Sequence, residues 1–347
     1  MPDVSLRTGQ GEKRIRGASQ DLAWYFLSLR KEITTRCTAT VGRKELYFVI
    51  LSPCDTGSFS VRYCAVMYCL LNTITLGFVH DTISLYMKKP HTPLIVGNWK
   101  MNPATLGAAR KLFLDLNKEI GRKKMETQIA VAPPFPFLSE MQRLSPSQRI
   151  DLSAQDVYFE SIGAHTGEVS LPMLKSVGVS SVIVGHSERR AAGESDEEIY
   201  KDMQAIFKSS LTAIVCVGEQ VRDQHGNYFG IVEAQLRSAL RSIPKTKLKQ
   251  LVIAYEPVWA IGTGKHATAE DVHEMKLFIQ KIIADVFGRS AIAKVRVLYG
   301  GSVKSKNAEE LLTVGVVDGF LIGGASLNAK EFAKIVHLAE AYAKTTV

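Results

Sequence analysis

Eight short apolar runs, separated by longer amphipathic segments, dominate the sequence after residue 93. The runs cover residues 94–97, 129–132, 150–155, 179–185, 212–218, 251–256, 295–300 and 318–324. Their continuous apolar character predicts strands that are buried on both faces, as in a parallel sheet. Eight strands in alternation with helices favour a (β/α)8 barrel of about 250 residues. An open doubly wound sheet is the alternative, because alternation alone does not close a barrel.

Residues 1–86 differ in character from residues 87–347. They show little regular period, and they contain one apolar stretch that begins at Tyr63 and ends at Val79 without a charged residue. This stretch is at the short limit for a membrane span. The extension could be a membrane anchor or organelle leader, an extra folded module, or no natural part of the protein. We expect the last, with a natural start at Met87, and thus a disordered or non-native extension before a single barrel domain.

The composition gives weaker constraints. The apolar fraction of 46% and charged fraction of 22% are ordinary for a globular protein. The net charge of +9 is spread without a dense Lys/Arg run, so we predict no nucleic-acid partner, while a small anionic substrate would suit the charge. Cys216 is the one cysteine of the barrel region, which indicates a reducing, cytoplasmic environment. Targeting through residues 1–86 is the alternative location.

Polar residues follow the predicted strands at the positions where barrel enzymes carry their reacting groups. Lys100 follows the first strand and is either a fixed charge in the barrel mouth or a surface lysine. His186 follows the fourth strand at a helix start, which disfavours imidazolium. It could instead be a packed structural histidine, or a metal ligand with Glu188, but no third ligand has suitable spacing. Glu256 ends the sixth strand, so its carboxylate is predicted at the rim.

Two further features predict a ligand at this end of the barrel. Residues 257–265 form a loop with an apolar middle around Trp259 and two glycines at its end, which is typical of a lid that closes over a ligand. An apolar loop packed on a neighbour is the alternative. Gly-Gly pairs follow the seventh and eighth strands, at 300–301 and 323–324, and such turns expose backbone N–H groups to an anion.

Together these segments resemble the triosephosphate isomerase family over about residues 90–345. The resemblance rests on seven motifs in the order of the family: GNWKMN, APPFPFL, GAHTGEVS, GHSERR, YEPVWAIGTGK, YGGSV and LIGGASL. It implies a (β/α)8 TIM barrel. It also implies interconversion of dihydroxyacetone phosphate and D-glyceraldehyde 3-phosphate through an enediolate, in glycolysis and gluconeogenesis, with neither cofactor nor metal.

The resemblance also implies residue roles. Glu256 would be the base, neutral His186 would polarise the carbonyl, and Lys100 would offset negative charge with Asn98 beside it. Glu188 and Arg189 would be a supporting ion pair. Residues 257–265 would be the lid, and the phosphate would be held at Gly262, Ser302, Gly323 and Gly324.

A homodimer is implied as well. The loop from Asp156 to Ser170 would insert into a partner subunit and bring Thr166 near its active site. Two departures from the family pattern bear on this region. His165 replaces a bulky aromatic residue, which weakens the predicted contact. Only Ala191 and Ala192 separate Arg190 from Gly193, one residue fewer than expected, which leaves the placement of Glu188 and Arg189 open.

Two other functions compete with this interpretation. A sugar-phosphate epimerase or an indole-pathway enzyme would share the barrel and the phosphate site, but the metal-ligating His and Asp set of such epimerases cannot be assembled here. A non-catalytic barrel is the second rival. The presence of Lys100, His186 and Glu256 argues against it.

Overall fold

The computed structural model describes residues 4–8, 11–15, 37–41, 44–48 and 91–347, except 146–148, 242, 261–266 and 346–347. The chain divides into two compact units, Met1–Asn72 and Thr73–Val347. In the first unit, strands β1 (Val4–Thr8), β2 (Gly11–Ile15), β3 (Cys37–Val41) and β4 (Lys44–Phe48) pair antiparallel in the order β2-β1-β3-β4.

The apolar stretch from Tyr63 to Val79 lies outside the described residues. The role of residues 1–86 and the boundary at Met87 therefore stay predictions. Among the helices that the structure describes, none combines the length and the apolar character needed to cross a bilayer.

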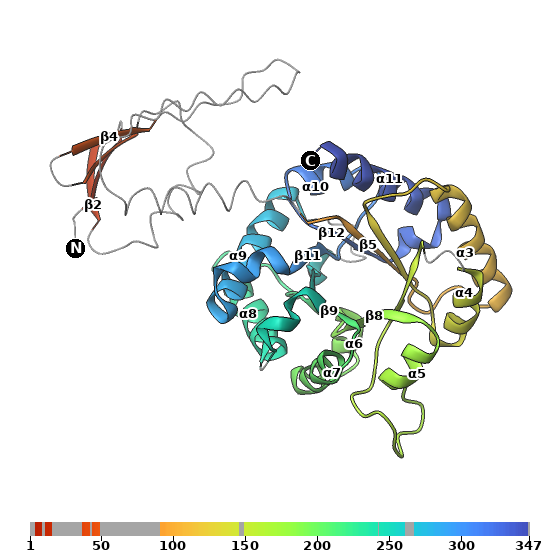
Figure 1. The fold of residues 1–347 in the computed structure, drawn as a ribbon. Coiled ribbons are helices and arrows are strands. Elements are labelled where there is room, and N and C mark those ends of the chain that lie inside the picture. Colours follow the sequence, from red (N-terminus) through yellow and green to blue (C-terminus); the bar gives the residue numbers. More distant parts are fainter. Residues whose placement is uncertain are drawn as a thin grey trace. The chain divides into compact units, whose positions relative to one another are not determined.

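The second unit is a closed barrel of eight parallel strands (Figure 1). The strands are β5 (Leu94–Asn98), β6 (Gln128–Ala132), β7 (Asp151–Ala154), β8 (Val179–Val184), β9 (Thr212–Val217), β10 (Leu251–Tyr255), β11 (Arg296–Tyr299) and β12 (Gly319–Ile322). Each strand pairs with its sequence neighbour. The last strand then returns to the first, with Gly319 opposite Leu94 and Ile322 opposite Gly97. This pairing closes the sheet, so the predicted barrel is confirmed and the open sheet is excluded.

Helices surround the strands as an outer ring (Figure 1). They are α3 (Leu106–Ile120), α4 (Leu138–Leu144), α5 (Leu171–Ser176), α6 (Ser187–Ala191), α7 (Asp196–Lys208), α8 (Asn227–Leu240), α9 (Ala269–Phe287), α10 (Ala308–Thr313) and α11 (Ala329–Thr345). Short 3-10 turns complete the connections: η1 (Phe135–Phe137), η2 (Lys245–Gln250), η3 (Val258–Ala260), η4 (Arg289–Lys294) and η5 (Gly324–Leu327). Two helix starts carry reciprocal capping boxes, Ser195 with Glu198 at α7 and Thr268 with Asp271 at α9.

Alternating residues of each strand enter two different apolar layers, because side chains alternate across a strand. Leu94 and Val96 point into the barrel with residues such as Ile214 and Leu298. Ile95, between them, joins the larger layer that separates the strands from the helices. Each such side chain contributes about 1.5–3 kcal/mol when fully buried. Burial on both faces explains why the strand sequences are apolar without interruption.

Candidate active site

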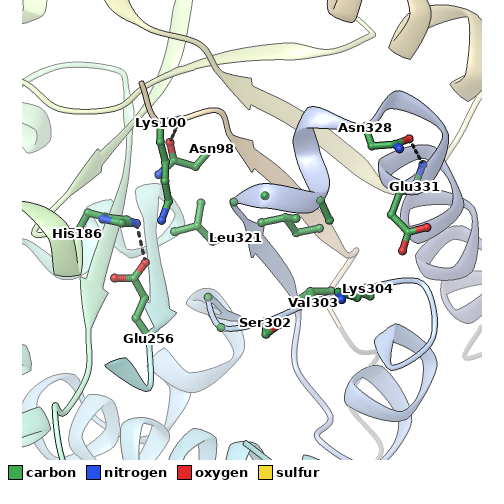
Figure 2. Close-up of a pocket in the computed structure, with 16 residues that line it drawn as sticks. Asn98, Lys100, His186, Glu256, Ser302, Val303, Lys304, Leu321, Asn328 and Glu331 are labelled. Atoms are coloured by element: carbon green, nitrogen blue, oxygen red, sulfur yellow. Dashed lines mark hydrogen bonds and ion pairs between the residues drawn. The ribbon is translucent and has the colours of Figure 1, made fainter. Parts of the chain in front are cut away.

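A cavity of about 610 Å³ opens at the carboxyl ends of the barrel strands (Figure 2). It is lined by seven residues to which the resemblance assigned a role, Asn98, Lys100, His186, Glu256, Ser302, Gly323 and Gly324, and by the glycine pair at 300–301. They end or follow five different strands, β5, β8, β10, β11 and β12, and parallel pairing brings all five strand ends to the same mouth. Gly262 lies outside the described residues.

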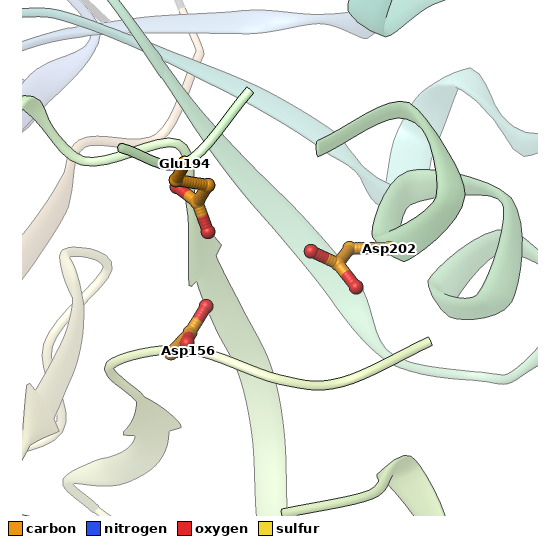
Figure 3. A group of neighbouring side chains, drawn as sticks. All are labelled: Asp156, Glu194 and Asp202. Atoms are coloured by element: carbon orange, nitrogen blue, oxygen red, sulfur yellow. The ribbon is translucent and has the colours of Figure 1, made fainter. Parts of the chain in front are cut away.

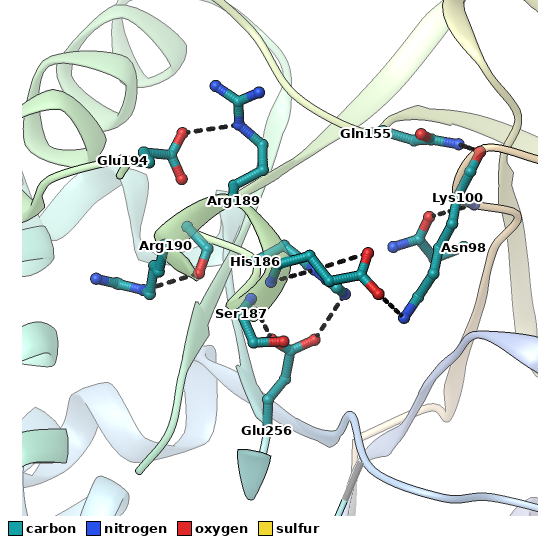
Figure 4. A network of polar contacts seen from close by, with 11 residues as sticks. Asn98, Lys100, Gln155, His186, Ser187, Arg189, Arg190, Glu194 and Glu256 are labelled. Carbon is teal, nitrogen blue, oxygen red and sulfur yellow. Dashed lines mark hydrogen bonds and ion pairs between the residues drawn. The ribbon is translucent and has the colours of Figure 1, made fainter. Parts of the chain in front are cut away.

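The Glu256 carboxylate is the most deeply buried charged group of this cavity, with 2% of the residue exposed. It stands directly after β10, and the backbone N–H of Glu256 donates to the carbonyl of Val217 at 2.8 Å, which prolongs the strand pairing. Oε1 lies 3.2 Å from Nε2 of His186, and Oε2 accepts a hydrogen bond from the backbone N–H of Ser187 at 2.9 Å (Figure 4). The carboxylate is thus held at the end of the fourth strand.

His186 is the N-cap residue of α6, and this position fixes its tautomer. Its Nδ1 accepts a hydrogen bond from the backbone N–H of Glu188 at 3.2 Å. A ring nitrogen that accepts carries no proton, so the proton of the neutral ring is on Nε2. That nitrogen faces Glu256 and the cavity (Figure 2). The ring can therefore donate a hydrogen bond to a bound carbonyl oxygen without being charged.

Lys100 adopts a left-handed backbone conformation, with φ of +53°, that residues other than glycine rarely adopt. Two hydrogen bonds hold it there. Its backbone N–H donates to Oδ1 of Asn98 at 3.0 Å, and its carbonyl accepts from Nε2 of Gln155 at 2.8 Å. The side-chain ammonium lies 2.6 Å from Oε1 of Glu188. Such strain persists only where neighbours enforce it, and here it directs a positive charge toward the cavity.

Gly323 and Gly324 form the wall of the cavity where β12 passes into η5. A Cβ on Gly323 would lie 3.2 Å from Cε of Lys100, whereas a Cβ on Gly324 would meet nothing within 4 Å. The first glycine thus leaves room for the lysine, and the second leaves its backbone accessible. Ser302 lines the same cavity after β11. Main-chain N–H groups in such turns suit an anion.

Glu188 and Arg189 do not pair with each other. Glu188 pairs with Lys100, while Arg189 lies 2.9 Å from Oδ2 of Asp156 and 3.1 Å from Oε1 of Glu194. The short segment after Arg190 thus still lets Glu194 reach back to Arg189. Thr166 belongs to the loop after β7 and does not line the cavity of its own chain.

Trp259, at the start of the predicted lid, is anchored to a buried carboxylate. Nε1 of Trp259 donates to Oε1 of Glu219 at 2.7 Å, and the hydroxyl of Tyr255 donates to the same oxygen at 2.9 Å. Burial raises the pKa of Glu219, and the hydrogen bonds from Trp259 and Tyr255 oppose this rise. Residues 261–266 lie outside the described residues, so the lid stays a prediction.

Sequence reasoning missed four residues that support the site. Gln155 fixes Lys100, Ser187 holds the Glu256 carboxylate, and Glu219 anchors Trp259. Arg190 donates from Nε to the carbonyl of Gly185 at 2.8 Å and lies 2.6 Å from Asp196. Gln155 and Glu219 each stand at the end of an apolar run, so their position after a strand was a usable signal. The contact of Ser187 is made by backbone and leaves no signal in the sequence.

The fold and the cavity define a (β/α)8-barrel enzyme whose buried carboxylate faces an imidazole nitrogen beside a fixed ammonium. Residues 93–339 match the sequence profile of triosephosphate isomerase. The chain belongs to the triosephosphate isomerase family.

Named relatives agree with this assignment. Triosephosphate isomerase of Thermoanaerobacter pseudethanolicus is 43% identical over 247 residues, which are 71% of this chain and 98% of the relative. That of Moorella thermoacetica is 43% identical over the same shares, and that of Carboxydothermus hydrogenoformans is 44% identical over 70% of this chain and 97% of its own. The predicted family, barrel and isomerase class are confirmed. The predicted interconversion of triose phosphates is the reaction of this family.

Proposed function

We propose that this chain interconverts dihydroxyacetone phosphate and D-glyceraldehyde 3-phosphate in glycolysis and gluconeogenesis, with Glu256 as the base. One observation carries the residue assignment. A buried carboxylate lies 3.2 Å from the proton-bearing nitrogen of His186, and both groups face the cavity that Lys100 also lines. A base and a hydrogen-bond donor so close together can act on neighbouring atoms of one small substrate.

In the proposed reaction, Glu256 removes a proton from the carbon next to the carbonyl of the ketone substrate. The electrons of that C–H bond form a carbon–carbon double bond, and the carbonyl oxygen becomes negatively charged. His186 donates from Nε2 to this oxygen, while Lys100 and Asn98 stabilise its charge. Return of the proton to the neighbouring carbon, with transfer of the hydroxyl proton between the two oxygens, gives the aldehyde. No external oxidant or cofactor is needed for this balance.

The hydrogen bond from the backbone N–H of Ser187 fixes the position of the Glu256 carboxylate before the reaction. Its Oε2 is 2.9 Å from the Ser187 nitrogen, so the carboxylate must leave this N–H to reach a substrate carbon. We propose that closure of the lid, residues 257–265, accompanies this movement and excludes water. The substrate phosphate would bind backbone N–H groups at Gly262, Gly323 and Gly324, with help from Ser302.

We further propose that the protein is a cytoplasmic homodimer joined through the loop from Asp156 to Ser170, with Thr166 near the partner's active site. Two large apolar side chains support an interface here. Ile162, within the loop, is 86% exposed, and Met101, next to Lys100, is 93% exposed. Both would be covered by a second copy of the chain. Targeting through residues 1–86 is the alternative location.

The test is the isomerisation rate of Glu256→Gln, measured by coupling glyceraldehyde 3-phosphate formation to a dehydrogenase. Loss of a positioned general base should lower turnover by about 10²–10⁴-fold. Glu309→Gln, which removes an exposed carboxylate on α10, is the matched control and should keep full activity. Near-normal turnover of a folded Glu256→Gln protein would refute the assignment of the base. A wild-type chain without isomerase activity would favour the non-catalytic barrel.

A further inference from the structure

Three carboxylates outside the active-site cavity converge on one point (Figure 3). They belong to Asp156, which follows β7, Glu194, between α6 and α7, and Asp202, within α7. One oxygen of each lies within 4.8 Å of one oxygen of the others. We call these three residues the acidic cluster. None of the three lines the cavity that holds Glu256.

The acidic cluster is buried and its hydrogen bonding is incomplete. Asp202 is 4% exposed and Asp156 is 8% exposed. Within the described part of the chain, no hydrogen-bond partner is found for three buried oxygens, Oδ1 of Asp156, Oε2 of Glu194 and Oδ1 of Asp202. A buried polar atom without a partner destabilises the folded chain, and a charged one does so more strongly. Three such atoms in one place are free to bind one shared ligand.

Among the described residues, Arg189 is the one cation in contact with the acidic cluster, and its charge does not balance that of three carboxylates. Arg189 lies 2.9 Å from Oδ2 of Asp156 and 3.1 Å from Oε1 of Glu194, so it contacts the oxygens that are not orphaned. Three ionised carboxylates and one guanidinium leave two negative charges. The charge must therefore be neutralised by protons or by a bound cation.

We propose that the acidic cluster binds a hard divalent cation, with Ca²⁺ as the best fit. All three ligands are carboxylate oxygens, which hard cations prefer, whereas zinc sites use mainly nitrogen and sulfur. Oxygens on opposite sides of Ca²⁺ lie about 4.6–5.2 Å apart, so three oxygens within 4.8 Å can share one ion at normal distances. Two positive charges also match the two uncompensated negative charges.

The ion would have a structural effect rather than a role in the reaction. Asp156 begins the loop that we assign to the dimer contact, and Glu194 follows the short helix α6, whose N-cap residue is His186. An ion shared by these segments and α7 would tie the loop to the helix that positions the imidazole. The proposal does not depend on the isomerase assignment, because its test measures binding and stability.

The test uses the full-length protein, stripped with EDTA, dialysed and titrated with CaCl₂, MgCl₂ or MnCl₂. Isothermal titration calorimetry should show one Ca²⁺ per chain. Ca²⁺ at 100 times its dissociation constant should raise the melting temperature by roughly 5–10 °C. Asp202→Asn keeps the side-chain size and removes one ligand charge. It should weaken Ca²⁺ binding by at least about tenfold, and it should melt higher than wild type in EDTA because carboxylate repulsion is relieved.

The matched control is Asp115→Asn, which removes a carboxylate from the surface of α3, where it pairs with Lys111. This variant should bind Ca²⁺ like the wild type. The proposal is refuted if the wild type shows neither heat of binding nor a shift in melting temperature with any of the three ions. It is also refuted if Asp202→Asn responds to Ca²⁺ as the wild type does. A cation-independent stability that changes only with pH would show that protons alone neutralise the acidic cluster.

Discussion

A single methyl group at Gly300 should displace the proposed base. Gly300 follows β11, and a Cβ built on it would lie 2.7 Å from Cγ of Glu256 and 3.3 Å from the carbonyl oxygen of Tyr255. Carbon atoms pack at about 3.5–4.0 Å, so the Glu256 side chain would have to move by about 1 Å. The backbone has little room to retreat, because the Gly300 N–H donates to the carbonyl of Tyr255 at 2.7 Å.

The size of the effect follows from this displacement. A misplacement of about 1 Å costs on the order of 100-fold in rate, which equals about 2.7 kcal/mol of activation free energy. We therefore expect kcat of Gly300→Ala to fall by about 100-fold. KM should change by only a few-fold, because the turn at Gly323 and Gly324 that we assign to the phosphate is not touched by the new methyl group.

The assay is the coupled isomerase rate, with the melting temperature measured in parallel. Gly230→Ala is the matched control, because its Cβ would lie on α8 with nothing within 4 Å. It should keep kcat and gain about 0.5–1 kcal/mol of stability from the better helix propensity of alanine. If folded Gly300→Ala keeps kcat within about threefold of wild type, the position of Glu256 does not limit turnover, and the reasoning fails.

Three further predictions concern other parts of the barrel. Lys276→Met removes an ammonium 3.2 Å from buried Asp318 and should cost about 3–5 kcal/mol in urea unfolding; adding Asp318→Asn should recover part of this, and a loss below 1 kcal/mol would contradict it. Burial raises the pKa of Glu219, so ionisation of this group makes the folded wild type less stable as pH rises above 4.5. The melting temperature of Glu219→Gln should therefore rise relative to that of the wild type as pH increases. A constant difference across pH would exclude this effect. Ile162→Asp should weaken the dimer in sedimentation experiments. An unchanged dimer would show that the loop is not part of the interface.

The barrel and the reacting groups were predictable because they depend on local patterns. Uninterrupted apolar runs marked the strands, and parallel strands bring their last residues to one mouth, so Lys100, His186 and Glu256 could be placed together before any coordinates. Glycine pairs were read only as sources of free N–H groups. The structure adds that Gly300 also makes room for the Glu256 side chain, which depends on a neighbour from another strand.

The rest of the site depends on contacts between distant segments. Arg189 was expected beside Glu188, its neighbour in sequence, but α6 turns the two side chains toward different partners, Lys100 and the acidic cluster. Gln155, after β7, reaches the carbonyl of Lys100, after β5, past the one strand between them, β6, and nothing local to either residue encodes that contact. The acidic cluster likewise joins three segments, and their proximity depends on the pairing of β7 with β8.

The pairing of β12 with β5 has a consequence for the order in which the protein can be completed during synthesis. Of the barrel strands, β5 is synthesised first and β12 last. Gly319 must then pack against the Leu94 carbonyl, where any side chain would collide. Until then both ends of the growing sheet carry unpaired backbone groups that can join a neighbouring nascent chain. A ribosome that stalls before β12 would therefore leave an aggregation-prone intermediate. Translation of the last thirty or so codons lets β12 pair with β5, and this pairing protects the preceding strands.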